Sequence, residues 1–386
     1  MAKFIYADNA ATTKLNTVAF EAMKPFLLQD YSNASQLYSF SRRAKKAIKE
    51  ARELIAQSIN AEFDEIYFTS GGTEADNWAI KGSVFSNLEK RAIITSSIEH
   101  HAILNPCVSI ERLGYPVAYL PVDNVGRIAP EMLRNYVTNN TYLVSIMMVN
   151  NEIGTIQPIK ELASIAHEYG AMFHTDAVQA IGHIKVDVKD LGIDMLSASA
   201  HKFGGPKGVG FFYIKRGTPI CAFMEGGAQE RQMRAGTENV AGIVGMAKAL
   251  VESCKVIEKA EELYSKEDFI LRELQQAGLV LNIDFKRNGD QNRGHHLPGV
   301  LSLSFREQDG EALMHLLDLN GIIVSTGAAC DSMNTQISHV LQRIGLNETF
   351  AKGTIRISLS HGNTDKEVEE ISRVLVKVLV RERNKI

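Results

Sequence analysis

The lysine at position 202 stands where a solvated surface lysine would be badly placed. Residues 197–208 read SASAHKFGGPKG, so Lys202 follows an apolar strand and a stretch of small residues. A lysine in such a position is well placed to form a Schiff base with an aldehyde cofactor. His201 before it and the glycines after it support this interpretation, although most lysines in proteins are simply solvated.

A second charged residue, Asp176, directly follows a predicted buried strand. Residues 173–179 read FHTDAVQ, and Asp176 lies 26 residues before Lys202. That interval holds one strand, one helix and a further strand, so both side chains are predicted at the same edge of a sheet. A buried carboxylate is costly unless it meets a cation, and a protonated pyridine nitrogen would be such a partner. A helix N-cap is the alternative, and the segment alone leaves it open.

A turn with two glycines could hold a phosphate. Residues 68–77 read FTSGGTEADN, a strand that runs through Gly71 and Gly72 into a predicted helix. Glycines let the backbone approach closely, and the N-H groups at the start of a helix suit an anion, with the Thr73 hydroxyl as a further donor. Neither a Walker lysine nor a G-x-G-x-x-G pattern accompanies them, so a plain turn is the commoner alternative.

Among the four cysteines, Cys330 is the best candidate for a nucleophile. Residues 321–332 read GIIVSTGAACDS, in which a predicted strand and small residues lead to a cysteine before a polar loop. A reactive thiol is expected in such a setting, whereas a structural cysteine normally lies among large apolar neighbours. Cys107, Cys221 and Cys254 stand in apolar or helical settings and are interpreted as core residues. No C-x-x-C pair indicates a disulfide framework or a zinc knuckle.

The adjacent histidines do not have the spacing of metal ligands. His100-His101 and His295-His296 would point apart on a strand or loop, and no H-x-x-x-H pattern appears, so no metal site is predicted. His100 stands at the tip of a predicted strand. It is better interpreted as an aromatic cover for a planar ring or as a proton shuttle.

The elements that must position these side chains alternate between helix and strand from about residue 38 to 280. One amphipathic helix is expected around residues 44–55, where apolar residues recur at helical spacing. Short apolar runs predict buried strands at residues 65–69, 92–95, 116–120, 142–149, 171–174, 194–197 and 210–214. This pattern is typical of an α/β sheet with helices on both faces, whose ligands bind at the strand ends.

Past residue 255 the pattern changes to a smaller α+β part. A long charged helix is followed by two short strands near residues 300–305 and 321–325, and the last helix begins with a capping box of Thr364 and Glu367. We therefore predict a large domain over residues 14–255 and a small domain formed by residues 1–13 and 256–386.

Composition supports a globular protein and argues against several other classes. The 386 residues are 45% hydrophobic and 23% charged, with a formal net charge of -3, so no positive field indicates direct nucleic-acid binding. The N-terminus lacks the features of a secretory signal, and no apolar run approaches the ~20 residues that span a bilayer. A cytoplasmic protein without membrane contact is expected.

These motifs together resemble one known family over nearly the whole chain. They are YADNAATT at residues 6–13, TSGGTE at 69–74, VNNEIG at 149–154, His201-Lys202, MRAGT at 233–237, Cys330, and TIRIS at 354–358. In this order they resemble the class V, fold-type I pyridoxal-phosphate enzymes and, among them, the cysteine desulfurases of the NifS and IscS type. The resemblance implies a mixed, mostly parallel seven-stranded sheet flanked by helices in a large cofactor-binding domain. The small α+β domain would carry the catalytic cysteine loop.

The resemblance also implies a role for each residue around the cofactor ring. Lys202 would hold pyridoxal 5'-phosphate covalently, and Asp176 would pair with the pyridine nitrogen. Gln179 would bind the ring hydroxyl. His100 would stack over the ring and, with Lys202, move protons.

Other positions are assigned by the same resemblance to the phosphate and to the substrate. The residues implied to hold the phosphate within one subunit are Gly72, Thr73, Ser199 and His201. Thr237 would reach the phosphate from the partner subunit, which places the site at a homodimer interface. Asn151 and Arg356 would bind the substrate carboxylate. Asn151 is also implied to bind the cofactor.

The implied reaction removes sulfur from L-cysteine, leaving L-alanine and a persulfide on Cys330. The sulfur would pass to an acceptor protein, which we expect to serve iron-sulfur cluster assembly, with tRNA thiolation and DNA phosphorothioation as alternative purposes. The competing functions are a selenocysteine lyase, another fold-type I reaction such as epimerisation or transamination, and a non-catalytic scaffold of a sulfur-transfer complex. Near Asn33 the chain lacks a proline common in the family, and DSMN at residues 331–334 replaces a frequent Thr-Ser-Ala.

Overall fold

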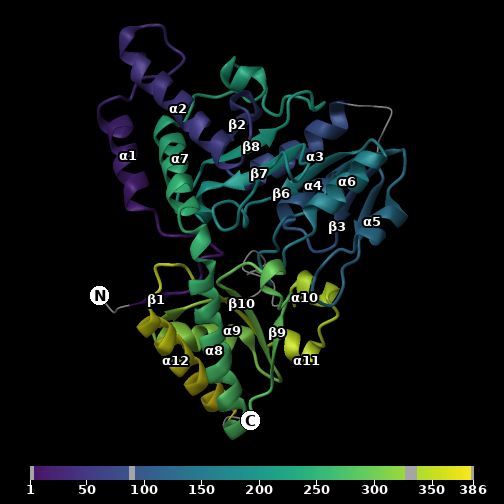
Figure 1. The fold of residues 1–386 in the computed structure, drawn as a ribbon, viewed down its shortest axis with the longest axis vertical. Helices are drawn as coiled ribbons and strands as arrows, with labels where there is room; N and C mark the ends of the chain where they lie inside the picture. Colours follow the sequence, from purple (N-terminus) through teal and green to yellow (C-terminus); the bar gives the residue numbers. More distant parts are fainter. Residues whose placement is uncertain (1–3, 87–91, 327–336, 384–386) are drawn as a thin grey trace.

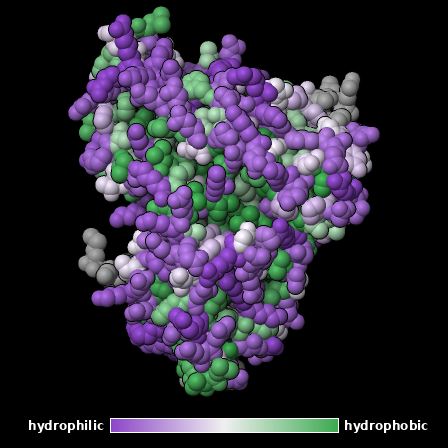
Figure 2. Space-filling model, in the orientation of Figure 1, coloured by the Kyte–Doolittle hydropathy of each residue, from purple (hydrophilic) through white to green (hydrophobic). Residues whose placement is uncertain are grey.

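The fold is built around two β-sheets, one in the upper and one in the lower part of the molecule in Figure 1. A computed structural model describes residues 4–86, 92–326 and 337–383. The long helix α8 (Ala260–Leu281) lies in the lower part, beside the second sheet (Figure 1). Hydrophilic residues dominate the face in the same view, and hydrophobic ones gather in the waist between the two parts (Figure 2).

The upper sheet has seven strands, and one of them runs opposite to the other six. In spatial order these are β2 (Ile66–Thr69), β8 (Gly210–Ile214), β7 (Met195–Ser199), β6 (Met172–Asp176), β5 (Thr141–Ser145), β3 (Ala92–Ser96) and β4 (Val117–Leu120). Strand β8 pairs antiparallel with β2 and β7, and the remaining pairs are parallel. The predicted α/β fold with a mixed, mostly parallel seven-stranded sheet is therefore confirmed.

Both faces of this sheet are covered, which explains why its central strands are apolar throughout. On β8, for example, Phe211 and Phe212 point to opposite faces and belong to two separate hydrophobic clusters. One face carries α1 (Thr17–Leu28), α2 (Arg42–Ser58), α5 (Pro130–Tyr136), α6 (Ile159–Glu168) and α7 (Val240–Cys254). The other face carries α3 (Gly72–Ser86) and α4 (His101–Arg112).

One predicted strand is shorter than its apolar run. The run at residues 142–149 ends as a strand at Ser145. The chain still follows β6 beyond that point, because Ile146 N donates to His174 O and Met148 N donates to Asp176 O. Apolar composition alone could not mark this change from strand to extended loop.

The lower part is an antiparallel sheet covered by helices. Its strands, in order, are β12 (Ser325–Thr326), β13 (Thr354–Ser358), β10 (Val300–Phe305) and β9 (Phe285–Asn288). Its helices, besides α8, are α9 (Gly310–Leu319), α10 (His339–Arg343), α11 (Glu348–Ala351) and α12 (Asp365–Arg383). The predicted capping box is present, since Thr364 N donates to Glu367 and Glu367 N donates to Thr364 Oγ1.

The N-terminal segment joins the two parts. Strand β1 (Ile5–Tyr6) pairs with β11 (Ile322–Ile323) in the lower part, and Asp8 bridges to Ser358. Thr13 N then donates to His201 O in the upper part. The domain boundaries at residues 13/14 and 255/256 remain a prediction. Within the described ranges, no helix is long and apolar enough to cross a membrane.

A strained turn lies against the edge of the upper sheet. Glu230, Arg231 and Gln232 all have positive φ, at 44°, 58° and 66°, and each such residue costs about 1–2 kcal/mol. A buried bidentate ion pair holds this turn, with Arg52 Nη1 and Nη2 each 2.7 Å from the Glu230 carboxylate. The same carboxylate accepts a hydrogen bond from Phe68 N of β2 at 2.9 Å.

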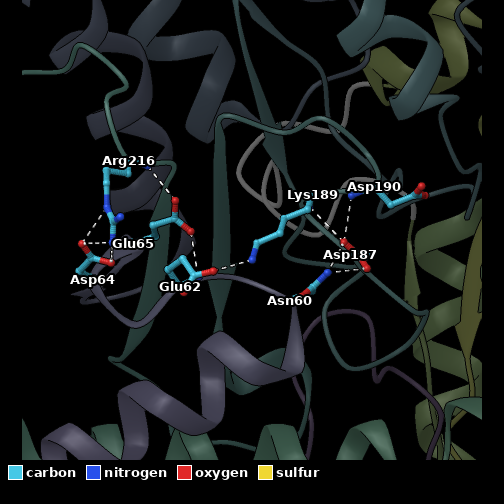
Figure 3. Close-up of polar contacts among 8 residues, drawn as sticks. All are labelled: Asn60, Glu62, Asp64, Glu65, Asp187, Lys189, Asp190 and Arg216. Carbon is cyan, nitrogen blue, oxygen red and sulfur yellow. Dashed lines mark hydrogen bonds and ion pairs between the residues drawn. The ribbon is translucent and has the colours of Figure 1, made fainter.

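We expect Arg52→Ala to destabilise the protein by about 3 kcal/mol, because Glu230 would be left as a buried, unpaired charge. Urea unfolding monitored by circular dichroism measures this change. Arg216 is the matched control, since it also forms a bidentate pair, with Asp64, but its side chain is 71% exposed (Figure 3). Arg216→Ala should leave the unfolding midpoint nearly unchanged. Equal losses in the two variants would contradict this account of the strained turn.

Candidate active site

A cavity of ≈ 370 Å³ lies where the strand ends of the upper sheet face the lower part. Most predicted site residues line it, and they are Gly72, Thr73, His100, Asn151, Asp176, Gln179, Ser199, His201, Lys202 and Arg356. They come from both parts of the molecule and from positions nearly 300 residues apart in the sequence, from Gly72 to Arg356. The structure thus brings together side chains that the sequence connected only by motif order.

Two predicted residues are not placed in this cavity. Thr237 is exposed and is not among the residues that line it. Cys330 lies outside the described residues. Of the other cysteines, Cys107 is buried as predicted, and burial raises the pKa of its thiol to about 12. Cys221 and Cys254 were also interpreted as core residues, but they are only partly buried.

Lys202 reaches the cavity from the end of strand β7. A 3-10 turn at Ala200–Lys202 follows the strand directly, so the side chain leaves at the carboxyl edge of the sheet. Its Nζ donates to Ala10 O at 2.7 Å and to Ala11 O at 2.9 Å. These carbonyls belong to the YADNAATT motif, which sequence reasoning recognised without assigning it a contact to the lysine.

Asp176 ends strand β6 beside Lys202, and it is not the N-cap of a helix. Its Oδ1 accepts a hydrogen bond from Val178 N at 2.9 Å, the local contact typical of a cap, but a turn and not a helix follows. The side chain is 6% exposed and lines the cavity. Burial raises the pKa of Asp176, while the Val178 hydrogen bond and the charge of Lys202 oppose that shift. A cation in the cavity would oppose it further.

The start of helix α3 forms one corner of the cavity. The first N-H groups of a helix have no partner within the helix, and its positive dipole end favours an anion. The backbone is tightly packed there, since a Cβ at Gly72 would come within 2.5 Å of Val178 Cγ2. Thr73 and Ser199 line the same corner. These features fit a phosphate group.

Burial favours the neutral form of two histidines that line the cavity, His100 and His201. His100 caps helix α4, and its Nδ1 accepts a hydrogen bond from Ala102 N at 3.1 Å, so its proton is on Nε2. Burial, together with the charge of Lys202, lowers the pKa of His100 to about 4. His201 has its pKa lowered to about 4 by the same two causes, and its Nδ1 lies 3.1 Å from Thr12 Oγ1.

A buried arginine faces the cavity from the small sheet. Arg356 is 1% exposed, and its Nη1 donates to Asn151 O while its Nη2 donates to Asp8 Oδ1, both at 2.9 Å. Its Nε has no hydrogen-bond partner among the described residues. An orphaned guanidinium N-H beside a cavity is suited to bind a carboxylate. Asp8 was not predicted, although it is the one charged residue of the YADNAATT motif.

Sequence reasoning also missed a layer of polar residues behind the cavity. The main members are Asp76, Glu99 and His174, which are at most 1% exposed. Glu99 accepts from Ser96 Oγ at 2.6 Å and from Met147 N at 2.9 Å. Asp76 could have been noticed, because it recurs at helical spacing with apolar residues on the buried face of α3.

The nitrogen of Gln179 is committed to the N-terminal segment. Its Nε2 donates to Ala10 O at 2.9 Å, so its Oε1 is the atom left for a ligand in the cavity.

Among the described residues, no three His, Cys, Asp or Glu side chains group as ligands of a metal ion.

Comparison with known proteins gives consistent matches over almost the whole chain. The model of the class-V aminotransferase family matches residues 5–371. Cysteine desulfurase IscS of Clostridium botulinum is 47% identical over 385 residues, which cover 99% of this chain and 96% of the relative. A solved NifS-like protein superposes with a TM-score of 0.91 at 36% identity, covering 97% of this chain and 99% of the other. SspA in complex with cysteine gives a TM-score of 0.79 at 36% identity, covering 92% and 98%.

Glu99 generates a pH-dependence that can be tested. Burial raises its pKa to about 8, so the folded protein keeps a proton there that the unfolded chain loses above about pH 4.5. The stability of the wild type relative to Glu99→Gln should therefore fall as pH rises between these values, by at most about 1.4 kcal/mol per pH unit. Urea unfolding of both proteins across this range measures the difference. A constant difference would mean that Glu99 is ionised in the fold.

Proposed function

Because the chain belongs to the class-V aminotransferase family, and within it to the cysteine desulfurases, we propose that it removes sulfur from L-cysteine with pyridoxal phosphate as its cofactor. The observation that carries this proposal is the meeting of Lys202, Asp176 and the first turn of α3 in one cavity. A half-buried lysine beside a buried acid has no structural purpose that would offset the cost of removing both charges from water.

The cavity residues divide between the parts of the cofactor. Lys202 would hold its aldehyde carbon, Asp176 its pyridine nitrogen, and Gln179 Oε1 its ring hydroxyl. The residues assigned to its phosphate are Gly72, Thr73, Ser199 and His201. When bound, pyridoxal phosphate supplies an electron sink for the bonds that break on the substrate.

The substrate carboxylate is assigned to Arg356 and Asn151. The guanidinium of Arg356 lines the cavity and is held in place by Asp8 and Asn151 O, which supports this role. That fixed guanidinium would orient the amino acid with its Cα toward Lys202. SspA, which has a similar fold, was solved in complex with cysteine.

Lys202 and Cys330 perform the bond changes in this proposal. Lys202 removes the Cα proton of the bound cysteine, and the Cys330 thiolate then attacks the substrate sulfur. The new S-S bond forms as the Cβ-S bond breaks, and the electron pair of the broken Cβ-S bond stays with Cβ. Cβ then takes a proton, so alanine leaves and Cys330 keeps the sulfur as a persulfide without any added oxidant. His100, neutral with its proton on Nε2, covers the cofactor ring.

The proposed roles of Thr237 and of the sulfur acceptor involve a second protein chain. Because Thr237 is exposed and lies outside the cavity of its own subunit, we propose that it completes the phosphate site of the second subunit in a homodimer.

The persulfide would pass its sulfur to an acceptor protein, and we propose an iron-sulfur scaffold. Transfer of labelled sulfur from Cys330 to a purified scaffold, compared with a tRNA-thiolation or phosphorothioation protein, distinguishes the pathways.

The test of the proposed function uses wild type, Lys202→Ala and Cys330→Ala with added pyridoxal phosphate and L-cysteine. The wild type should be yellow and release alanine and sulfide with a reductant. Lys202→Ala should lose the absorbance band of the lysine-bound cofactor, and its activity should fall by at least about 10³-fold. Cys330→Ala should stay yellow but release almost no alanine. A wild type that stays colourless would overturn the proposal.

Substitution of the buried arginine tests substrate binding separately. Arg356→Lys keeps the charge but loses the planar fork, so KM for cysteine should rise by about 10- to 100-fold while the cofactor spectrum is retained. The matched control is Arg373→Lys on α12, a bidentate but exposed arginine that should leave KM unchanged. If Arg356→Lys lowers kcat and leaves KM unchanged, the carboxylate is bound elsewhere.

A further inference from the structure

A second buried carboxyl lies behind Asp176 and has no role in the proposed reaction. Asp76 stands on α3, is 1% exposed and contributes to the wall of the cavity. Its Oδ1 has no hydrogen-bond partner among the described residues. The nearest possible cation, His174 Nε2, is 3.8 Å from that oxygen.

The groups around Asp76 supply no positive charge. His174 is buried, which lowers the pKa of its ring to about 3, and it is therefore neutral. Its Nδ1 lies 2.8 Å from Ser145 Oγ and its Nε2 lies 3.0 Å from Ser197 Oγ. The Ser197 hydroxyl opposes the rise in the pKa of Asp76, but burial outweighs it. A polar layer thus runs from β5 through β6 and β7 to α3.

Besides the neutral His174, the titratable groups that face Asp76 are both acids. They are Asp176, from β6, and Glu99, from the segment before α4. Burial, followed by the charge of Asp176, raises the pKa of Asp76 well above its ordinary value. Two carboxyls in one dry site cannot both ionise at low cost, so one of them keeps its proton. Asp176 has the Val178 N-H and Lys202 to favour its charge, which leaves the proton on Asp76.

We propose that Asp76 is a positioning residue, a neutral acid that supports Asp176 from behind and leaves it as the single carboxylate able to pair with the cofactor's ring nitrogen. This inference rests on the proposed function. The neutral carboxyl supplies a dipole beside Ser197, and it adds no competing negative charge. Asp76 therefore acts through Asp176 and touches neither the reacting carbon nor the reacting sulfur.

The test compares two cofactors in three full-length proteins. Wild type, Asp76→Asn and Asp76→Leu are reconstituted with pyridoxal phosphate and with its analogue in which carbon replaces the ring nitrogen. The dissociation constant of each cofactor is measured by fluorescence, and the midpoint of the pH titration of the bound cofactor is measured by absorbance. Asparagine preserves a neutral polar group of the same size, whereas leucine fills the space without polarity.

We expect Asp76→Asn to bind both cofactors within about threefold of the wild type, with an unshifted spectral midpoint. Asp76→Leu should bind pyridoxal phosphate about tenfold more weakly and shift the midpoint, yet bind the analogue nearly as well as the wild type does. A purely structural role predicts equal losses for the two cofactors. If the leucine variant does not fold, Asp76→Ala takes its place in the same comparison.

Three outcomes overturn the inference. Equal weakening of both cofactors in the leucine or alanine variant means that Asp76 only supports the packing. A loss in Asp76→Asn as large as that in Asp76→Leu means that Asp76 carries the charge. Unchanged affinities in every variant mean that it has no role. A wild type that binds neither cofactor contradicts the proposed function itself, and that result is distinct from the other three.

Discussion

The site depends on gathering several charges, some of them buried, in one cavity. Lys202, Asp176 and Arg356 all line it, and in such surroundings an unsatisfied charge is expensive. Each is met by contacts from a remote or adjoining segment: Lys202 by two carbonyls, Asp176 by a backbone N-H, and Arg356 by a carboxylate and a carbonyl. The fold therefore has to bring the strand ends of the large sheet, the N-terminal segment and the small sheet to one place.

The N-terminal segment meets much of that demand. Asp8 holds Arg356 in the lower part, and two residues later Ala10 accepts hydrogen bonds from both Lys202 and Gln179 in the upper part. The segment is fixed at both ends, by the pairing of β1 with β11 and by Thr13 N donating to His201 O. A movement of the two parts relative to each other would therefore disturb the lysine and the arginine together.

The family resemblance supplied several residues that line the cavity, such as Asn151 and Arg356. The sequence itself predicted the α/β class, most strand positions and the candidates Lys202 and Asp176, because apolar runs and strand-end motifs are local signals. It did not predict where the strand after residue 142 ends, since Met148 continues along β6 by a hydrogen bond that depends on its neighbour. The polar segment at residues 288–298 is partly buried, with His296 at 1% exposure. Its burial comes from a bridge to Thr155, a contact between distant segments that no local pattern marks.

Protonation states could not be predicted from the sequence, because they depend on burial and on neighbours that only the fold brings close. Asp176 faces the cavity with Lys202 and the Val178 N-H to favour its charge, whereas burial favours the neutral forms of His174 and Glu99 behind it. When the groups that line the cavity are charged and those behind it are neutral, the electrostatic field is concentrated where a ligand would lie. If the acids behind the cavity, such as Glu99, were charged as well, the negative field would be shared among several carboxylates and less of it would reach the cavity.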